Sequence, residues 1–217
     1  MKIKGAIFDM DGTLIDSMKY WETVGIEYLK LNNIDFNNER DNYILQVGIK
    51  QFSDFCNKEY GLNKTYEEVL QDIHDLMAEK YKTVVTLKAG AKEMLEKFKQ
   101  NGVKMCVATA TEQKEAKEVL KKLDVLDYFD EVITTTMVGA DKTSPLIYET
   151  ALDFLGTSKE ETYIFEDAFY AIHTLHKAGF KIVGVEEIYS SVPSIEIAPL
   201  CTYFLWGKDE YNVSFLE

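Results

Sequence analysis

Short apolar runs and helical periodicities alternate along most of this chain. The first run, Ile3 to Phe8, contains large apolar residues and stops at Asp9, which predicts a buried β-strand. Further strands are predicted at 104–108, 131–135, 162–165 and 181–185, with a short last one at 201–205, and the intervening periodicities predict helices at 91–100, 112–123, 145–155 and up to Ala178. Because strands and helices alternate, we predict an α/β fold with a doubly wound parallel sheet.

Residues 17 to 84 have a different pattern, in which apolar side chains recur at helical spacing and no strand pattern intervenes. Helices are predicted after Ser17, over about residues 40–58 with a break near Gly48, and after Thr65, which forms a capping-box motif with Glu68. We therefore predict two domains. Residues 1–16 and 85–217 form the α/β core, residues 17–84 form an inserted all-helical domain, and the two linkers act as a paired hinge.

The composition is that of an ordinary globular protein, with 46% hydrophobic and 28% charged residues among 217. A formal charge of −13 argues against nucleic acid and anionic membranes as partners, since both attract basic surfaces. The three cysteines are widely spaced and predict reduced thiols. No signal-like segment and no run of about 20 apolar residues is present, so we expect a cytoplasmic monomer that acts on a small molecule.

Polar residues that could take part in catalysis or binding follow four of the apolar segments. In chain order they are Asp9 with Asp11, Thr109 with Thr111, Lys142, and Glu166 with Asp167. Each has an ordinary structural explanation, such as a hydroxyl at a strand end, a solvated loop lysine or an acid pair at a helix start. In a parallel sheet, however, the carboxyl ends of the strands share one edge, where ligands bind. Their common placement predicts a single site.

These segments resemble the four motifs of the haloacid dehalogenase superfamily. FDMDGTLIDS resembles the first motif, D-x-D-G-T-L-x-D, and VATAT, DKTSPLIY and IFEDAFYAI resemble the second, third and fourth. The resemblance spans residues 3 to about 186, and the helical domain matches the family's cap in position and helicity. It implies a Rossmann-like core with a helical cap and, for most members, phosphatase or phosphomutase activity.

The resemblance also implies roles for individual residues. Asp9 is then the nucleophile that forms an aspartyl phosphate, and Asp11 the general acid and base. Thr109 and Lys142, with the backbone amide of Ala110, would bind the phosphoryl oxygens. The chemistry agrees, because a carboxylate nucleophile divides one difficult displacement into two easier ones.

A magnesium ion is the implied cofactor. By the resemblance, Asp9, Asp167 and the main-chain carbonyl of Asp11 would hold Mg²⁺, while Glu166 would bind it directly or through water. Magnesium prefers oxygen ligands and is usually bound by one or two carboxylates together with substrate phosphate. The helix that carries His173 and His176 offers no third ligand of the Cys or His type, so no zinc site is expected.

Departures from the family pattern also bear on the function. Thr143 and Leu146 replace a Pro and an Asp that are common in the third motif, and Ala168 and Ala171 replace common residues of the fourth. Trp21 stands where mutases resembling β-phosphoglucomutase commonly carry a His.

We therefore expect a Mg²⁺-dependent phosphatase for a sugar or organic-acid phosphate, with a sugar-phosphate mutase as the alternative. A non-enzymatic phosphoacceptor module and a dehalogenase fit less well. Lys50, near Gly48, is either a second anion contact or an exposed helix lysine.

Overall fold

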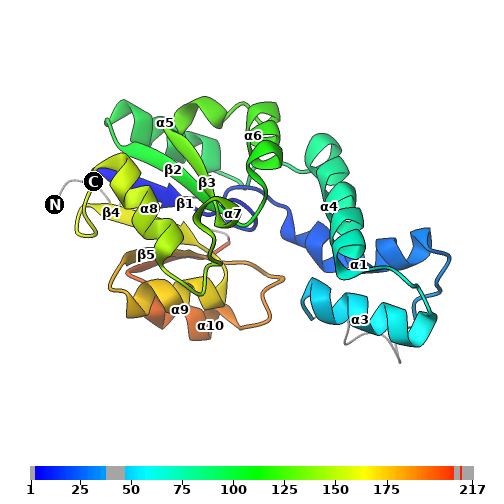
Figure 1. Ribbon diagram of the computed structural model, residues 1–217. Coiled ribbons are helices and arrows are strands. Elements are labelled where there is room, and N and C mark those ends of the chain that lie inside the picture. The colour runs from blue at the N-terminus through cyan, green and yellow to red at the C-terminus, as the bar shows by residue number, and fades with distance from the viewer. Residues whose placement is uncertain (1–2, 38–46, 208–210, 212–217) are drawn as a thin grey trace. The chain divides into compact units, whose positions relative to one another are not determined.

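The computed structural model describes residues 3–37, 47–207 and 211 (Figure 1). The chain divides into two compact units. One comprises Met1–Asp16 and Thr86–Glu217, and the other comprises Ser17–Val85. Within the described residues, no helix combines the length and the apolarity needed to cross a membrane.

The larger unit contains a six-stranded sheet in which every neighbouring pair is parallel. The strand order is β3-β2-β1-β4-β5-β6. The strands are β1 (Gly5–Phe8), β2 (Lys104–Thr109), β3 (Glu131–Thr134), β4 (Thr162–Glu166), β5 (Lys181–Val185) and β6 (Tyr203–Leu205). The first strand in the sequence thus lies between β2 and β4, and the predicted doubly wound α/β fold is confirmed.

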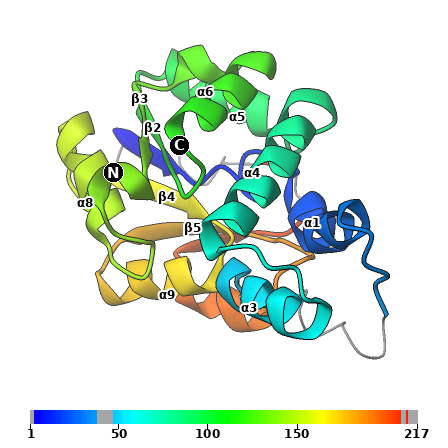
Figure 2. The same ribbon diagram turned by 45° about the vertical axis from the view of Figure 1, so that its right-hand side comes forward.

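Helices cover both faces of this sheet (Figures 1 and 2). They are α5 (Ala91–Gln100), α6 (Gln113–Lys122), α7 (Thr135–Val138), α8 (Leu146–Leu155), α9 (Phe169–Lys177) and α10 (Ser194–Ile197), with 3-10 turns η2 (Leu126–Tyr128) and η3 (Ala198–Leu200). In both views α5 and α6 lie on one side of the sheet and α8 and α9 on the other.

Alternating side chains of the strands supply the two layers of the core. Ile7 of β1 points into a buried cluster with residues of α8 and α9, among them Ile147 and Ile172. Phe8 points to the opposite face, where its ring stacks on Phe165 at 4.6 Å and meets Phe98 of α5 at 6.2 Å. Burial on both faces explains why the strands read as continuous apolar runs.

Several predicted boundaries in this unit are one or two residues off, and two of these shifts have a visible local cause. The strand predicted to end at 135 ends at Thr134, whose hydroxyl accepts the Met137 amide at 3.2 Å and starts the short helix α7. The helix expected to include Pro145 begins at Leu146, with Pro145 as its N-cap. Neither shift moves a candidate site residue away from its strand end.

The smaller unit is helical, with α1 (Met18–Leu31), α3 (Ile49–Tyr60) and α4 (Tyr66–Thr83). The capping box of Thr65 and Glu68 is present at the start of α4. Ser17 occupies the N-cap of α1 without a side-chain capping bond. The predicted break near Gly48 corresponds to the start of α3, and the part of that predicted helix at 40–46 lies outside the described residues.

The two segments of the larger unit that lead to the helical unit are paired with each other. The Asp16 amide donates to the carbonyl of Thr86 at 2.9 Å, and the Lys88 amide donates to the carbonyl of Leu14 at 2.9 Å. Ile15 and Leu87 form an antiparallel bridge between them. Both connections are therefore fixed to the same point of the α/β unit.

Gly184→Ala tests the packing between β5 and the C-terminal strand. A Cβ atom at Gly184 would lie 2.5 Å from a ring carbon of Phe204 and 2.6 Å from the sulfur of Cys201, so β6 must shift. We expect a loss of about 1–3 kcal/mol of unfolding free energy, as for other overpacked cores, measured as a lowered Tm. Gly48→Ala is the control, because among the described residues its Cβ meets just the flexible Gln51 side chain, at 3.1 Å. Equal Tm values for the two variants would contradict this packing.

Candidate active site

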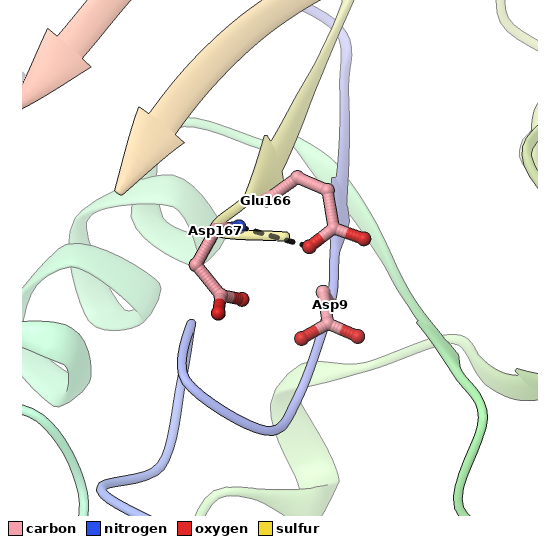
Figure 3. Close-up of side chains that lie close together, drawn as sticks. All are labelled: Asp9, Glu166 and Asp167. Carbon is pink, nitrogen blue, oxygen red and sulfur yellow. Dashed lines mark hydrogen bonds between the residues drawn. The ribbon is translucent and has the colours of Figure 1, made fainter. Parts of the chain in front are cut away.

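Three acidic side chains meet at the carboxyl edge of the sheet (Figure 3). Asp9 follows β1, Glu166 ends β4 and Asp167 follows it. Since Phe8 and Phe165 are register partners, the residues that come next are neighbours as well. One carboxylate oxygen of each acid lies within 4.8 Å of the others, and all three residues are buried.

Lys142 supplies a buried positive charge to this cluster. Its ammonium group donates to Asp9 Oδ1 and, at 2.9 Å, to Glu166 Oε1. Although burial opposes the charge on Lys142, Asp9 and Glu166 together hold its pKa well above the usual range. Lys142 is therefore an ammonium ion that pairs with two carboxylates.

One ammonium group does not balance three carboxylates. Burial raises the pKa of Asp9 to about 8, with Glu166 and Asp11 adding to the rise and Lys142 opposing it. Burial, followed by the charges of Glu166 and Asp9, also holds the pKa of Asp167 well above its usual range. The cluster is therefore short of positive charge.

Three of the four acids accept a hydrogen bond from a hydroxyl group. Thr13 donates to Asp167 at 2.8 Å, Thr111 to Asp11 at 2.7 Å and Tyr148 to Glu166 at 2.9 Å. Such bonds favour the ionised carboxylate and fix its orientation. Asp9 differs, since within the described residues its side chain accepts hydrogen bonds from Lys142 alone, through Oδ1. Its second oxygen is therefore the uncommitted carboxylate oxygen of a buried acid.

Glu166 has the most complete set of donors. Oε2 accepts the amides of Asp167 at 2.9 Å and Ala168 at 3.3 Å, the first of which is drawn in Figure 3. Oε1 accepts from Lys142 and Tyr148. A carboxylate offers about four lone-pair directions, and four donors occupy them. This arrangement makes Asp9 and Asp167 better placed than Glu166 to coordinate a cation directly.

Thr109 lies at the end of β2, the strand next to β1. Its buried hydroxyl accepts the Thr111 amide at 3.0 Å, and within the described residues its side chain makes no hydrogen bond to the acids. The loop that it begins reaches the first motif through the bond from Thr111 to Asp11. Ala110 is exposed at the tip of this loop.

The cluster has the chemistry of a divalent cation site. A buried group of carboxylates with unbalanced negative charge favours a cation, and an all-oxygen ligand set favours Mg²⁺, Ca²⁺ or Mn²⁺ over softer metals. Among the residues that the structure describes, Asp9, Glu166 and Asp167 form the single group of this kind. The residues present therefore fit the cation that the sequence motifs imply.

Other candidate residues take ordinary structural roles. Lys50 is 70% exposed and pairs with Asp54 at 3.6 Å on α3. The ring of His176 contacts the carbonyl of Leu200 at 2.9 Å. Cys56, Cys106 and Cys201 are free thiols.

The sequence placed Thr111 in the predicted site without a specific role, and it indicated no role for the other two hydroxyl donors, Thr13 and Tyr148. The threonines lie inside the recognised motifs, so their positions were visible but their partners were not. Tyr148 lies on α8, where its position on the buried helix face is that of a core residue.

The model of the haloacid dehalogenase-like hydrolase family matches residues 6–185. The chain belongs to this family. The family predicted from the four motifs is thus confirmed.

Two relatives match most of the chain. The phosphorylated carbohydrates phosphatase of Thermotoga maritima is 27% identical over 197 residues, which cover 89% of this chain and 87% of that protein. The pyrophosphatase PpaX of Bacillus mycoides is 29% identical over 192 residues, covering 85% and 84%.

Among solved structures, a presumed β-phosphoglucomutase from Thermotoga maritima has a TM-score of 0.81 at 23% identity, covering 97% of this chain and 98% of that one. CbbY from Rhodobacter sphaeroides, in complex with phosphate, has a TM-score of 0.74 at 19% identity and covers 94% and 93%. These likenesses show a shared fold.

Lys142→Met tests the charge balance of the cluster. The variant leaves buried Asp9 and Glu166 without their cation, and breaking a buried pair typically costs about 3–5 kcal/mol. In EDTA we expect the Tm of the variant to lie clearly below that of the wild type. Addition of Mg²⁺ should recover part of this difference. Lys50→Met removes an exposed pair and should cost less than about 1 kcal/mol. If Lys142→Met is as stable as Lys50→Met in EDTA, the cluster does not depend on that charge.

Proposed function

We propose that this protein is a Mg²⁺-dependent phosphatase that hydrolyses a small phosphomonoester through an aspartyl phosphate on Asp9. The observation that carries the proposal is a buried carboxylate held beside an ammonium group and two further acids, with one oxygen that accepts no hydrogen bond from the described part of the chain. Family membership and two relatives that are named phosphatases support it.

Asp9 and Asp167, with the main-chain carbonyl of Asp11, would hold the cation. The Glu166 carboxylate already accepts four hydrogen bonds, so it would contact the cation through a water molecule while it also holds Lys142. When bound, the cation offsets negative charge on the phosphoryl oxygens, which is the main requirement of phosphoryl transfer.

In the first step, the free oxygen of Asp9 attacks phosphorus while the bond from phosphorus to the ester oxygen breaks. Asp11, oriented by the Thr111 hydroxyl, gives its proton to the departing alkoxide. Lys142 has a third N–H that can donate to a phosphoryl oxygen, and Thr109 with the Ala110 amide would bind the others. The covalent product is a mixed anhydride between Asp9 and the phosphoryl group.

In the second step, water attacks the phosphorus atom and Asp11 takes a proton from it. The bond between the Asp9 oxygen and phosphorus breaks, which releases inorganic phosphate and restores both aspartates. The helical unit is proposed to act as the family's cap and select the leaving group. For substrate class we propose sugar or organic-acid phosphates, with carbohydrate phosphates favoured by the Thermotoga maritima relative.

A sugar-phosphate mutase is the alternative. Trp21 occupies the position at which such mutases commonly carry a His, and its indole N–H donates to the hydroxyl of Tyr81 at 3.2 Å. An indole cannot shuttle a proton as an imidazole does. This favours hydrolysis over isomerisation.

A panel of sugar and organic-acid phosphates, assayed with Mg²⁺, tests the proposal. The wild type should release inorganic phosphate from at least one ester, Asp9→Asn should release none, and Asp11→Asn should be slower by about 10²–10⁴-fold. Asp153→Asn, an exposed position on α8, is the control and should match the wild type. No hydrolysis by the wild type, or full activity of Asp9→Asn, would refute the phosphatase, and isomerised sugar phosphate in place of free phosphate would establish the mutase.

Metal dependence gives a separate prediction. EDTA should abolish turnover and Mg²⁺ should restore it, whereas Ca²⁺ should not, because Ca²⁺ takes more ligands at longer distances and would draw both Asp9 oxygens to itself. Steady-state rates across a cation series measure this. Full activity in EDTA after dialysis would contradict a cation-dependent step.

A further inference from the structure

Tyr148 is fully buried on α8, inside the apolar cluster that packs against the sheet. Its ring lies 6.3 Å from that of Phe180. A phenylalanine would occupy the same space without the cost of burying a hydroxyl. Within the described residues the hydroxyl has a single partner, Glu166, to which it donates at 2.9 Å. The contact with Glu166 is therefore the one interaction that Tyr makes here and Phe would not.

The oxygen that accepts from Tyr148 is also the oxygen that accepts from Lys142. Both bonds to Glu166 Oε1 are 2.9 Å long, and the Lys142 ammonium lies 5.8 Å from the centre of the Tyr148 ring. Tyr148 thus donates to one member of this pair and has its ring near the other. Its burial separates it from any substrate, so it has no direct part in the reaction.

Four donors hold the Glu166 carboxylate, two on each oxygen, and Tyr148 provides the only neutral side-chain donor among them. Without its hydroxyl, Oε1 would accept from Lys142 alone, and the carboxylate and the ammonium could turn together toward Asp9. The ammonium would then neutralise the nucleophile more fully and direct fewer N–H groups at the phosphoryl group.

We propose that Tyr148 is a positioning residue that fixes Glu166, and through it directs Lys142 between Asp9 and the phosphoryl oxygens. This inference rests on the proposed function, since it assigns a phosphoryl group to Lys142. It goes beyond that function because it names a residue outside the four acids that sets the position of the Lys142 ammonium group.

Tyr148→Phe, which deletes the hydroxyl alone, tests the proposal. We expect kcat/KM for the best ester to fall about tenfold, as for the loss of a hydrogen bond to a charged group, with a parallel rise in the Kd of inorganic phosphate measured calorimetrically in Mg²⁺. Tyr163→Phe is the matched control, because that tyrosine lies on β4 beside Tyr203 and outside the site. It should stay within about twofold of wild type.

A double-mutant cycle separates positioning from general loss of stability. In Glu166→Gln the side-chain oxygen should face the two backbone amides, which turns the NH₂ group toward Tyr148 and removes the acceptor. Tyr148→Phe should then change kcat/KM by less than about twofold in that background. If Glu166→Gln fails to fold, the phosphate Kd values of Tyr148→Phe and Tyr163→Phe decide whether Tyr148 has a positioning role.

The proposal is overturned if Tyr148→Phe matches Tyr163→Phe in both kinetics and phosphate binding, or if its effect persists unchanged in the Glu166→Gln background. If the wild type hydrolyses no ester, the proposed function fails. The phosphate Kd still tests Tyr148 in that case.

Discussion

The mutual repulsion of buried carboxylates is the constraint that the site depends on. Asp9, Glu166 and Asp167 are brought within 4.8 Å of one another because β1 and β4 are adjacent and parallel, and their chains leave the sheet at the same edge. Such a group is stable only with compensating charge and hydrogen bonds. Lys142, the hydroxyl donors and a proposed divalent cation supply them.

The compensation is distributed unequally, and this inequality distinguishes the acids. Glu166 accepts four hydrogen bonds, whereas Asp9 accepts from Lys142 alone among the residues that the structure describes, through one of its two oxygens. Asp11 and Asp167 are each oriented by a threonine hydroxyl. The same strand ends therefore provide one acid suited to nucleophilic attack and others suited to support.

Much of this could be predicted from the sequence, because its signals are local. Apolar runs that end in acids predicted the strands and the edge where Asp9 and Asp167 emerge, and the capping box at Thr65 predicted the start of α4. The hydroxyl partners could not be predicted, since Tyr148 has the spacing of a core residue and only the packing of α8 against the sheet brings it to Glu166. The arrangement of hydrogen-bond donors around the Glu166 carboxylate likewise depends on side-chain geometry that no motif encodes.

A crystal structure of the protein grown with Mg²⁺ tests the central claim most directly. The account predicts a Mg²⁺ ion about 2.0–2.1 Å from one oxygen of Asp9, one oxygen of Asp167 and the main-chain carbonyl of Asp11, with water between the ion and Glu166. Lys142 and Tyr148 should remain on Glu166 Oε1. An ion bound away from these acids, or a Glu166 that leaves Lys142 to coordinate it directly, would contradict the account.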